Sequence, residues 1–210
     1  WEACGYEIDK IQEDSVYRLK REPLRRFEDL AEHNIQSMNI IKTSWKVPME
    51  VKVVELIEKL RLENPTITPD DIGVVFTGGN KSGYAFADIL EQIIEAKFGW
   101  KLNKAYESKY KVKGELFISN KNNVKGLEFP FVICISEHIS NAKHERNALY
   151  MLLTRSFIQS FLLVPETINP TEDAKLASLE AGLRIIEQND YIEVVLPSDD
   201  EKEALNTNID

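Results

Sequence analysis

From about residue 65 onward, short β-branched runs alternate with longer stretches of helical periodicity, and this alternation constrains the fold more than any other feature. Such alternation is typical of parallel strands joined by crossover helices. The run at 130–136 is continuously apolar, as expected of a strand that is covered on both faces. The sequence therefore predicts an α/β domain with a mostly parallel sheet and helices on both faces.

The expected elements follow one another in a regular order. Strands are expected at 72–77, 116–119, 130–136, 161–164 and 191–196, and helices at 84–97, at 143–154 and from Pro170 onward. The last helix has the clearest start, because Asn169 suits the cap position, Pro170 the first turn and Glu172 a capping box. Before residue 65 the pattern is less regular, with a strand at 5–8 and helices near 23–36 and 49–62.

Charge and cysteine content exclude several classes of protein. The 210 residues carry 26 Lys and Arg against 35 Asp and Glu, a net charge of -9, so any contact with nucleic acid must be local. Cys4 and Cys134 lie far apart without neighbours at ligand spacing, which favours neither disulfides nor a metal site and indicates the cytoplasm. No apolar stretch approaches the roughly 18 residues of a membrane span. The start at Trp1 favours a piece of a longer protein.

The segment 77–83, Thr-Gly-Gly-Asn-Lys-Ser-Gly, lies between an expected strand and an expected helix, as phosphate-binding loops do. A P-loop needs a glycine, four further residues and then Gly-Lys-Ser or Gly-Lys-Thr, whereas here Asn80 precedes Lys81. A tight strand-to-helix turn is the favoured interpretation. A separate phosphate-binding enzyme built on this turn is a rival hypothesis.

A second segment, 118–133, reads Ile-Ser-Asn-Lys-Asn-Asn-Val-Lys-Gly-Leu-Glu-Phe-Pro-Phe-Val-Ile. It resembles motif V of superfamily 1 helicases of the UvrD/Rep type, Thr-x-His-x-Ala-Lys-Gly-Leu-Glu-Phe followed by a buried strand. Residues 125–129 match that pattern in full, and Val124 stands in place of its alanine. Asn120 and Asn122 replace its threonine and histidine.

A third segment, 145–156, reads Glu-Arg-Asn-Ala-Leu-Tyr-Met-Leu-Leu-Thr-Arg-Ser and resembles motif VI of the same helicases. That motif runs Glu-Arg-Arg-x-x-Tyr-x-x-x-Thr-Arg, and Asn147 replaces its second arginine. Both motifs occur in the right order with a strand between them. The resemblance implies a RecA-like fold of the P-loop NTPase type, specifically the second motor domain of a helicase. ATP with Mg²⁺ would then be bound mainly by a first RecA-like domain that this chain does not contain.

The resemblance also implies roles for individual residues. Arg155 would be the catalytic arginine finger, because a permanently charged planar fork stabilises charge that develops on the γ-phosphate. The other nucleotide contacts would be Lys125, Gly126 and Glu128, with Glu128 accepting hydrogen bonds from the ribose hydroxyls. The nucleic-acid contacts would be Asn120, Asn122 and Thr154.

Simpler interpretations of the same residues stay open. Arg155 is also explained as a cation that stabilises a helix C-terminus, and Glu128 is also explained as a solvated surface carboxylate. Gly126 and the two asparagines also suit turns. A run of lysines with interleaved tyrosines is either a single-strand track or, as the favoured interpretation, a solvated basic loop; it comprises Lys97, Lys101, Lys104, Tyr106, Lys109, Tyr110, Lys111 and Lys113.

The resulting hypothesis is the C-terminal motor domain of an ATP-dependent DNA helicase or translocase. We expect a lead-in segment at 1–65 that packs on the same domain, the RecA-like domain at 66–197 with both motifs, and an acidic tail at 198–210. The expected partners are single-stranded DNA, with RNA as an open alternative, and the N-terminal RecA-like domain of the same protein. The chain alone should not hydrolyse ATP, because it lacks the phosphate-holding lysine and the Mg²⁺ ligands. The alternative is a degenerate helicase-like binding module without hydrolysis.

Overall fold

The structure is a computed structural model that describes residues 6–10, 16–21, 37–44, 46–77, 81–139, 142–166, 170–189 and 192–195. The chain divides into two compact units. Unit 1 comprises Trp1–Ile35 and Glu180–Asp210, and unit 2 comprises Gln36–Leu179. The expected helix near 23–36, the cap at Asn169 and the acidic tail lie outside the described residues.

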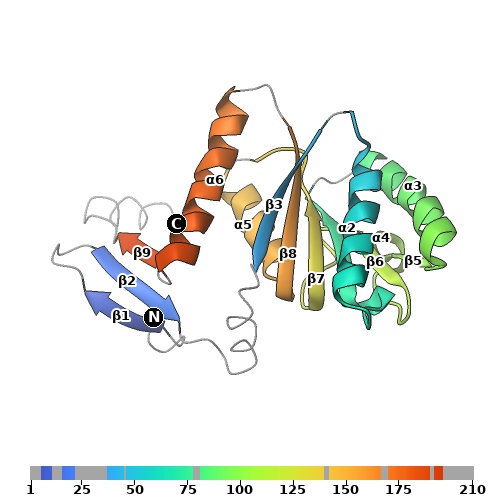
Figure 1. Cartoon of the computed structure of the whole chain (residues 1–210), viewed down its shortest axis with the longest axis horizontal. Helices are drawn as coiled ribbons and strands as arrows, with labels where there is room; N and C mark the ends of the chain where they lie inside the picture. The colour runs from blue at the N-terminus through green and yellow to red at the C-terminus, as the bar shows by residue number, and fades with distance from the viewer. Residues whose placement is uncertain are drawn as a thin grey trace, which may run out of the picture. The chain divides into compact units, whose positions relative to one another are not determined.

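Unit 2 is built on a parallel six-stranded sheet of order β3-β8-β7-β4-β6-β5 (Figure 1). Its strands are β3 (Met38–Thr43), β4 (Ile72–Phe76), β5 (Leu102–Lys104), β6 (Leu116–Asn120), β7 (Phe129–Ile135) and β8 (Ser156–Pro165). Every neighbouring pair runs parallel. The central strands β4 and β6 are buried along their whole length, which explains their continuous apolar character. The predicted α/β class with a parallel sheet is confirmed.

Helices cover both faces of this sheet. On one face, α2 (Met49–Glu63) and α3 (Lys81–Phe98) pack through Val53, Ile57, Leu90 and Ile94. On the other face, α5 (Lys143–Leu153) and the first part of α6 (Pro170–Asn189) pack through Leu152 and Leu176 (Figure 1). Two short elements complete this unit: η3 (Pro69–Asp71) lies between α2 and β4, and α4 (Ala105–Ser108) lies between β5 and β6.

The expected boundaries in unit 2 are close to the observed ones, with informative differences. Helix α3 begins at Lys81, three residues before the expected start, and β8 begins at Ser156 rather than at residue 161. The sequence did not indicate β3 or β5. Both are edge strands of the sheet: β3 is mostly only partly buried, and β5 has three residues of which two are polar, so the apolar signal of each is weak.

Unit 1 contains a three-stranded antiparallel sheet of order β1-β2-β9, formed by β1 (Tyr6–Lys10), β2 (Val16–Arg21) and β9 (Ile192–Val195). The strand expected at 191–196 therefore pairs with β2 and does not extend the parallel sheet. Conversely, β3 and α2 precede residue 66 yet belong to unit 2, because β3 pairs with β8. The observed units thus divide the chain differently from the expected segments 1–65, 66–197 and 198–210.

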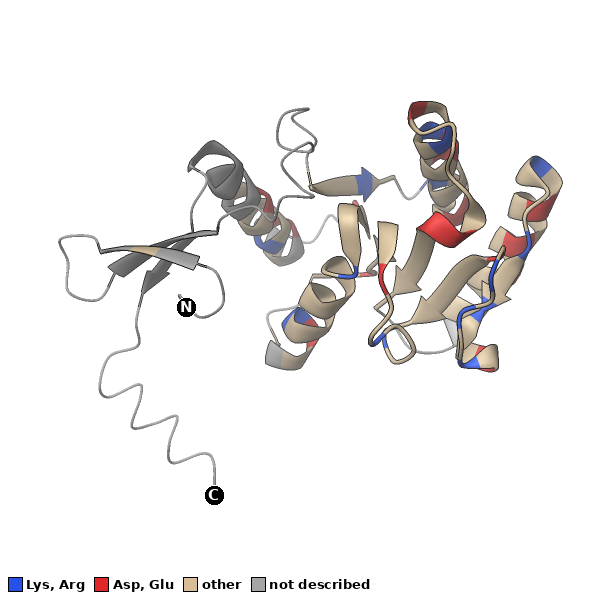
Figure 2. Ribbon diagram, turned by 90° about the horizontal axis from the view of Figure 1, so that it is seen from below, with Lys and Arg blue, Asp and Glu red and all other residues tan. Residues whose placement is uncertain are grey.

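The charged residues of the described chain are interspersed rather than segregated by sign (Figure 2). Several lie in ion pairs on exposed helix surfaces, such as Lys52 with Glu55 and Lys97 with Glu58. None of the described helices is both long and apolar enough to cross a membrane.

An aromatic cluster closes the end of the core beside β4. Tyr106 lies at a ring-centroid distance of 4.4 Å from Tyr84 and 6.2 Å from Phe76. Its ring is buried, and its hydroxyl has no hydrogen-bond partner among the described residues. Burial also raises the pKa of Tyr106 to about 12. A buried hydroxyl without a partner destabilises the folded state.

Replacing Tyr106 by Phe should therefore raise the free energy of unfolding by roughly 1 kcal/mol, because it removes the uncompensated hydroxyl and keeps the ring. Urea denaturation of the chain measures this change. The matched control is Tyr110→Phe at a side chain that is 65% exposed, where we expect a change within about 0.5 kcal/mol. A loss of stability in Tyr106→Phe would mean that the hydroxyl has a partner in solution.

Candidate nucleotide and nucleic-acid sites

Because its strands are parallel, the sheet of unit 2 has two chemically different edges. We call the end of the sheet at which β7 and β8 begin the amino edge, and the end at which β4 and β6 finish the carboxyl edge. These two edges are the ends of the strands and differ from the edge strands β3 and β5. Glu128, Thr154 and Arg155 lie at the amino edge, directly before β7 and β8. Asn120 and Asn122 lie at the carboxyl edge, at the end of β6 and beyond it. The predicted nucleotide and nucleic-acid contacts are thus separated, except for Thr154.

A segment without a helix, residues 121–128, connects the two edges. It follows β6 and leads into β7, and these parallel strands lie on either side of β4. Val124 lies in the middle of the segment and is fully buried against Val75, Phe117 and Phe129. The segment is therefore held on the sheet face that α5 and α6 also cover.

Gly126 lies in a tight turn of this segment. The amide of Leu127 donates to the carbonyl of Val124 at 3.1 Å, and Gly126 has a φ of 82°. A Cβ atom at Gly126 would meet nothing within 4 Å, so the left-handed backbone rather than close packing favours glycine here. Lys125 precedes it and is exposed. The turn accounts for Gly126 without a ligand, and its nucleotide contact stays a prediction.

At the amino edge, one backbone hydrogen bond joins the two motifs. The amide of Phe129 donates to the carbonyl of Arg155 at 2.9 Å, and Phe129 pairs with Ser156 in the sheet register. Glu128 and Arg155, the residues just before this pair, are therefore neighbours across two adjacent strands. Beneath them the Phe129 ring is fully buried against Gly73, where a Cβ atom would lie 2.8 Å from the ring.

The charged groups at this edge do not neutralise one another. Arg155 is half-buried, and its Nε donates to the carbonyl of Met151 at 3.0 Å. The Glu128 carboxylate is exposed. Within the described part of the chain, neither side chain has an ion-pair partner at 4.0 Å or less, and the two do not pair with each other. The backbones that carry a guanidinium and a carboxylate are thus adjacent, and neither charged group is neutralised by an ion pair among the described residues.

Two serine hydroxyls hold the turn that carries Arg155. Ser160 is buried in β8 and donates to the carbonyl of Leu153, the last residue of α5. Its oxygen also lies 2.7 Å from the hydroxyl oxygen of Ser156. These two bonds bracket residues 154 and 155 from both sides, so the serine pair fixes the backbone from which Arg155 projects.

Thr154 caps the end of α5 in the same turn. Its hydroxyl lies 2.9 Å from the carbonyl oxygen of Tyr150 and 3.2 Å from that of Met151, and it donates to these helix-end acceptors. The structure therefore places Thr154 beside Arg155 and at the opposite edge from Asn120 and Asn122. Its predicted contact with nucleic acid has no geometric support at this position.

The asparagines at the carboxyl edge differ from one another. Asn120 is only 6% exposed, and its Oδ1 accepts from the backbone amide of Asn122 at 3.0 Å and from Nδ2 of Asn123 at 3.3 Å. Its side chain thus forms the turn that ends β6, as the simpler interpretation expected. Asn122 is exposed, and its side-chain amide has no partner among the described residues.

Several members of the lysine and tyrosine run, for which a single-strand track was the less favoured interpretation, have partners within the domain. Lys104 pairs with Asp88 and Glu91 at 2.6 and 2.7 Å, and these carboxylates raise its pKa. Lys109 donates to the carbonyl of Tyr106, which is itself buried, and Lys111 donates to the carbonyl of Asp70.

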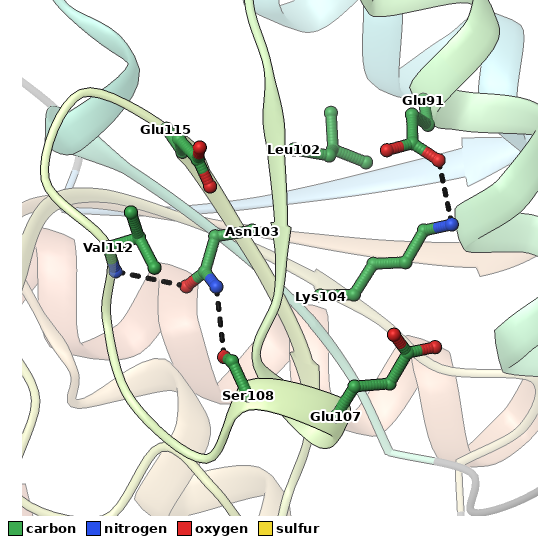
Figure 3. A pocket seen from close by; sticks show the side chains of 8 residues that line it. All are labelled: Glu91, Leu102, Asn103, Lys104, Glu107, Ser108, Val112 and Glu115. Atoms are coloured by element: carbon green, nitrogen blue, oxygen red, sulfur yellow. Dashed lines mark hydrogen bonds and ion pairs between the residues drawn. The ribbon is translucent and has the colours of Figure 1, made fainter.

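A pocket of about 510 Å³ lies in the same region, beside the edge strand β5 (Figure 3). Its lining includes the carboxylates of Glu91, Glu107 and Glu115. The side chain of Asn103 spans it, donating to Ser108 Oγ and accepting from the amide of Val112. The carboxylates that line this pocket disfavour a phosphate ligand. We therefore interpret Lys104, Lys109 and Lys111 as residues that stabilise the loop around the pocket.

The comparisons with known proteins agree with the motifs. Residues 115–163 match the family model of the UvrD-like helicase C-terminal domain. The resemblance to UvrD-type helicases is confirmed. The matched segment contains the whole crossover 121–128 and both edges described above.

Among solved structures, one similar chain is the C-terminal domain of a possible DNA helicase from Lactobacillus plantarum WCFS1. It is 17% identical, with a TM-score of 0.44, over 69% of this chain and 83% of that one. No curated protein matches the sequence.

The sequence did not indicate Ser160 as part of the site, because it lies outside both motifs. Its spacing from Ser156 gave no signal either, because residues four apart in a regular strand lie about 13 Å apart, and the register shift of β7 and β8 between Phe129 and Phe131 is not visible in the sequence.

Replacing Ser160 by Ala should lower the free energy of unfolding by about 1–3 kcal/mol, because the carbonyl of Leu153 then loses its buried donor. Urea denaturation of the chain measures the change. The matched control is Ser156→Ala, which leaves the bond from Ser160 to Leu153 intact and should cost about 1 kcal/mol or less. Equal losses in the two variants would contradict the assignment of Ser160 as the principal donor.

Proposed function

We propose that this chain is the C-terminal motor domain of an ATP-dependent DNA helicase or translocase, with Arg155 as its arginine finger. The observation that carries the proposal is the bond from the Phe129 amide to the Arg155 carbonyl, which places Glu128 and Arg155 side by side in the matched segment. A nucleotide bound by a first RecA-like domain would meet both residues at the amino edge.

Arg155 acts on the phosphates in this proposal. When water attacks the γ-phosphorus and the bond to the β-phosphate breaks, negative charge spreads over the transferred oxygens, and bound Mg²⁺ neutralises part of it. The guanidinium donates to these oxygens and stabilises the remainder. Nε donates to the carbonyl of Met151, so the two terminal nitrogens are the donors available to the phosphate oxygens.

Glu128 acts on the sugar. An exposed carboxylate without an ion-pair partner accepts hydrogen bonds from ribose hydroxyls more strongly than a neutral group would. Lys125 is exposed in the preceding turn and adds positive charge on the same crossover.

The carboxyl edge binds the nucleic acid. The exposed carboxamide of Asn122 donates to phosphate or sugar oxygens, which fixes position without reading sequence. Only eight residues separate Asn120 from Phe129. A movement of the bound nucleic acid at the carboxyl edge is therefore transmitted along residues 121–128 to Glu128 at the amino edge.

In the full-length protein, Arg155→Ala should lower kcat for ATP hydrolysis by about 10³- to 10⁵-fold, while ATP affinity changes much less. The reason is that the finger contributes mainly when charge develops in the transition state. Steady-state ATPase kinetics and a nucleotide titration measure the two quantities. Arg155→Lys should not restore turnover, because an ammonium group lacks the planar fork.

The matched control is Arg61→Ala. This arginine lies on α2 over the rings of Phe98 and Trp100, far along the chain from either motif, so its loss should leave kcat near that of the wild type. A stable, ATP-binding Arg155→Ala protein with normal turnover would refute the finger and leave the rival hypothesis of a binding module without hydrolysis.

Asn122→Ala should raise the DNA concentration needed for half-maximal stimulation of ATPase activity by about fivefold, with basal activity unchanged, because it removes one hydrogen bond to the strand. The contrasting variant is Asn120→Ala, whose side chain is internal and whose loss should lower the melting temperature instead. Parallel loss of basal and stimulated activity in Asn122→Ala would assign that residue a structural role.

A further inference from the structure

An exposed tyrosine lies at the same corner of the carboxyl edge as the asparagine turn. Phe76, the last residue of β4, pairs in register with Asn120, the last residue of β6, so their side chains project from the same face of the sheet. The Tyr84 ring lies edge-on to Phe76 at a centroid distance of 6.5 Å. Tyr84 is 39% exposed although the residues on which it packs are buried.

One face of the Tyr84 ring packs on the ring of Tyr106. Its centroid lies 4.4 Å from that of Tyr106 with an angle of 32° between the rings, and Tyr106 is only 7% exposed. The close approach of α3 depends on Gly83, where a Cβ atom would lie 2.5 Å from the Phe76 ring. One face of Tyr84 is therefore covered by a fixed ring, and little side-chain entropy remains to be lost when a flat ligand binds.

The residues that follow β6 at the same carboxyl edge suit an unpaired nucleotide. Lys121 and the exposed Asn122 directly follow Asn120, and both can donate to phosphate oxygens. A chain with a net charge of -9 gains little from general electrostatic attraction to nucleic acid, so stacking is the interaction by which it can hold a strand.

We propose that Tyr84 is a stacking platform for one unpaired nucleobase, whose adjoining phosphate is bound by Lys121 and Asn122. This inference rests on the proposed function for the presence of a single strand at the carboxyl edge. It adds a contact outside both helicase motifs and outside the matched segment 115–163. Every base has a flat π-face, so the platform is indifferent to sequence.

The test compares two single strands of equal length and phosphate number, oligothymidylate and a fully abasic strand, by fluorescence anisotropy with the full-length protein. Tyr84→Ala should weaken binding of oligothymidylate at least about fivefold, the lower range measured for base stacking on an aromatic ring. On the abasic strand, wild type and Tyr84→Ala should bind equally. Tyr84→Phe should behave as wild type on both strands.

Two controls separate stacking from an effect on folding. Tyr84→Leu keeps apolar bulk over Tyr106 and should still lose the preference for the strand with bases. Tyr110→Ala removes a tyrosine that is 65% exposed on another loop and should bind both strands as the wild type does.

The proposal is overturned if Tyr84→Ala binds oligothymidylate as tightly as wild type, or if it weakens both strands by the same factor. Binding of a proline-rich peptide in place of DNA would also overturn it, because such a ligand also uses an exposed tyrosine. None of these outcomes bears on the arginine finger, which the ATPase activity of Arg155→Ala decides separately.

Discussion

The backbone hydrogen bond from Phe129 to Arg155 is the interaction on which the geometry of the candidate site depends. It is an ordinary sheet bond at the start of a strand pair, yet it brings together residues from two motifs that are 27 positions apart in sequence. The buried Phe129 ring against Gly73 fixes one side of it, and the Ser156 and Ser160 hydroxyls fix the other. The core thus positions the backbones from which the Glu128 carboxylate and the Arg155 guanidinium project.

The second constraint is the shortness of the crossover between β6 and β7. Parallel strands are commonly joined by a helix, but here residues 121–128 return along the sheet face with Val124 buried in the core and Leu127 packed against it. Such a segment has few internal degrees of freedom, because a turn with Gly126 at positive φ follows its anchor. Under the proposed function, this stiffness is useful: a strand bound beside Asn122 and a nucleotide bound beside Glu128 contact the two ends of one short connection.

Strong local signals made much of unit 2 predictable. The apolar runs of β4 and β7 and the Pro170 start of α6 are local features, and both motifs indicated the helicase family whose model matches residues 115–163. Pairing partners were not predictable, because the pattern of β9 suits any sheet, and β9 joins β2. The role of single side chains was equally hidden: Asn120 and Asn122 look alike in the sequence, but only the fold shows that one is buried in a turn and the other is exposed.

The distribution of charge between the two edges gives a physical reason for the proposed division of labour. The amino edge presents full charges without ion-pair partners among the described residues, which suit the concentrated charge and the ribose of a nucleotide. At the end of β6 and the start of α3, the carboxyl edge presents the Asn122 carboxamide, Lys121 and the Tyr84 ring supported by Tyr106, which suit a ligand that must be held yet released during movement. Strong ionic contacts there would hold each phosphate too tightly and make binding steeply dependent on salt. Stacking avoids both effects, and a net charge of -9 is then compatible with a domain that binds a polyanion.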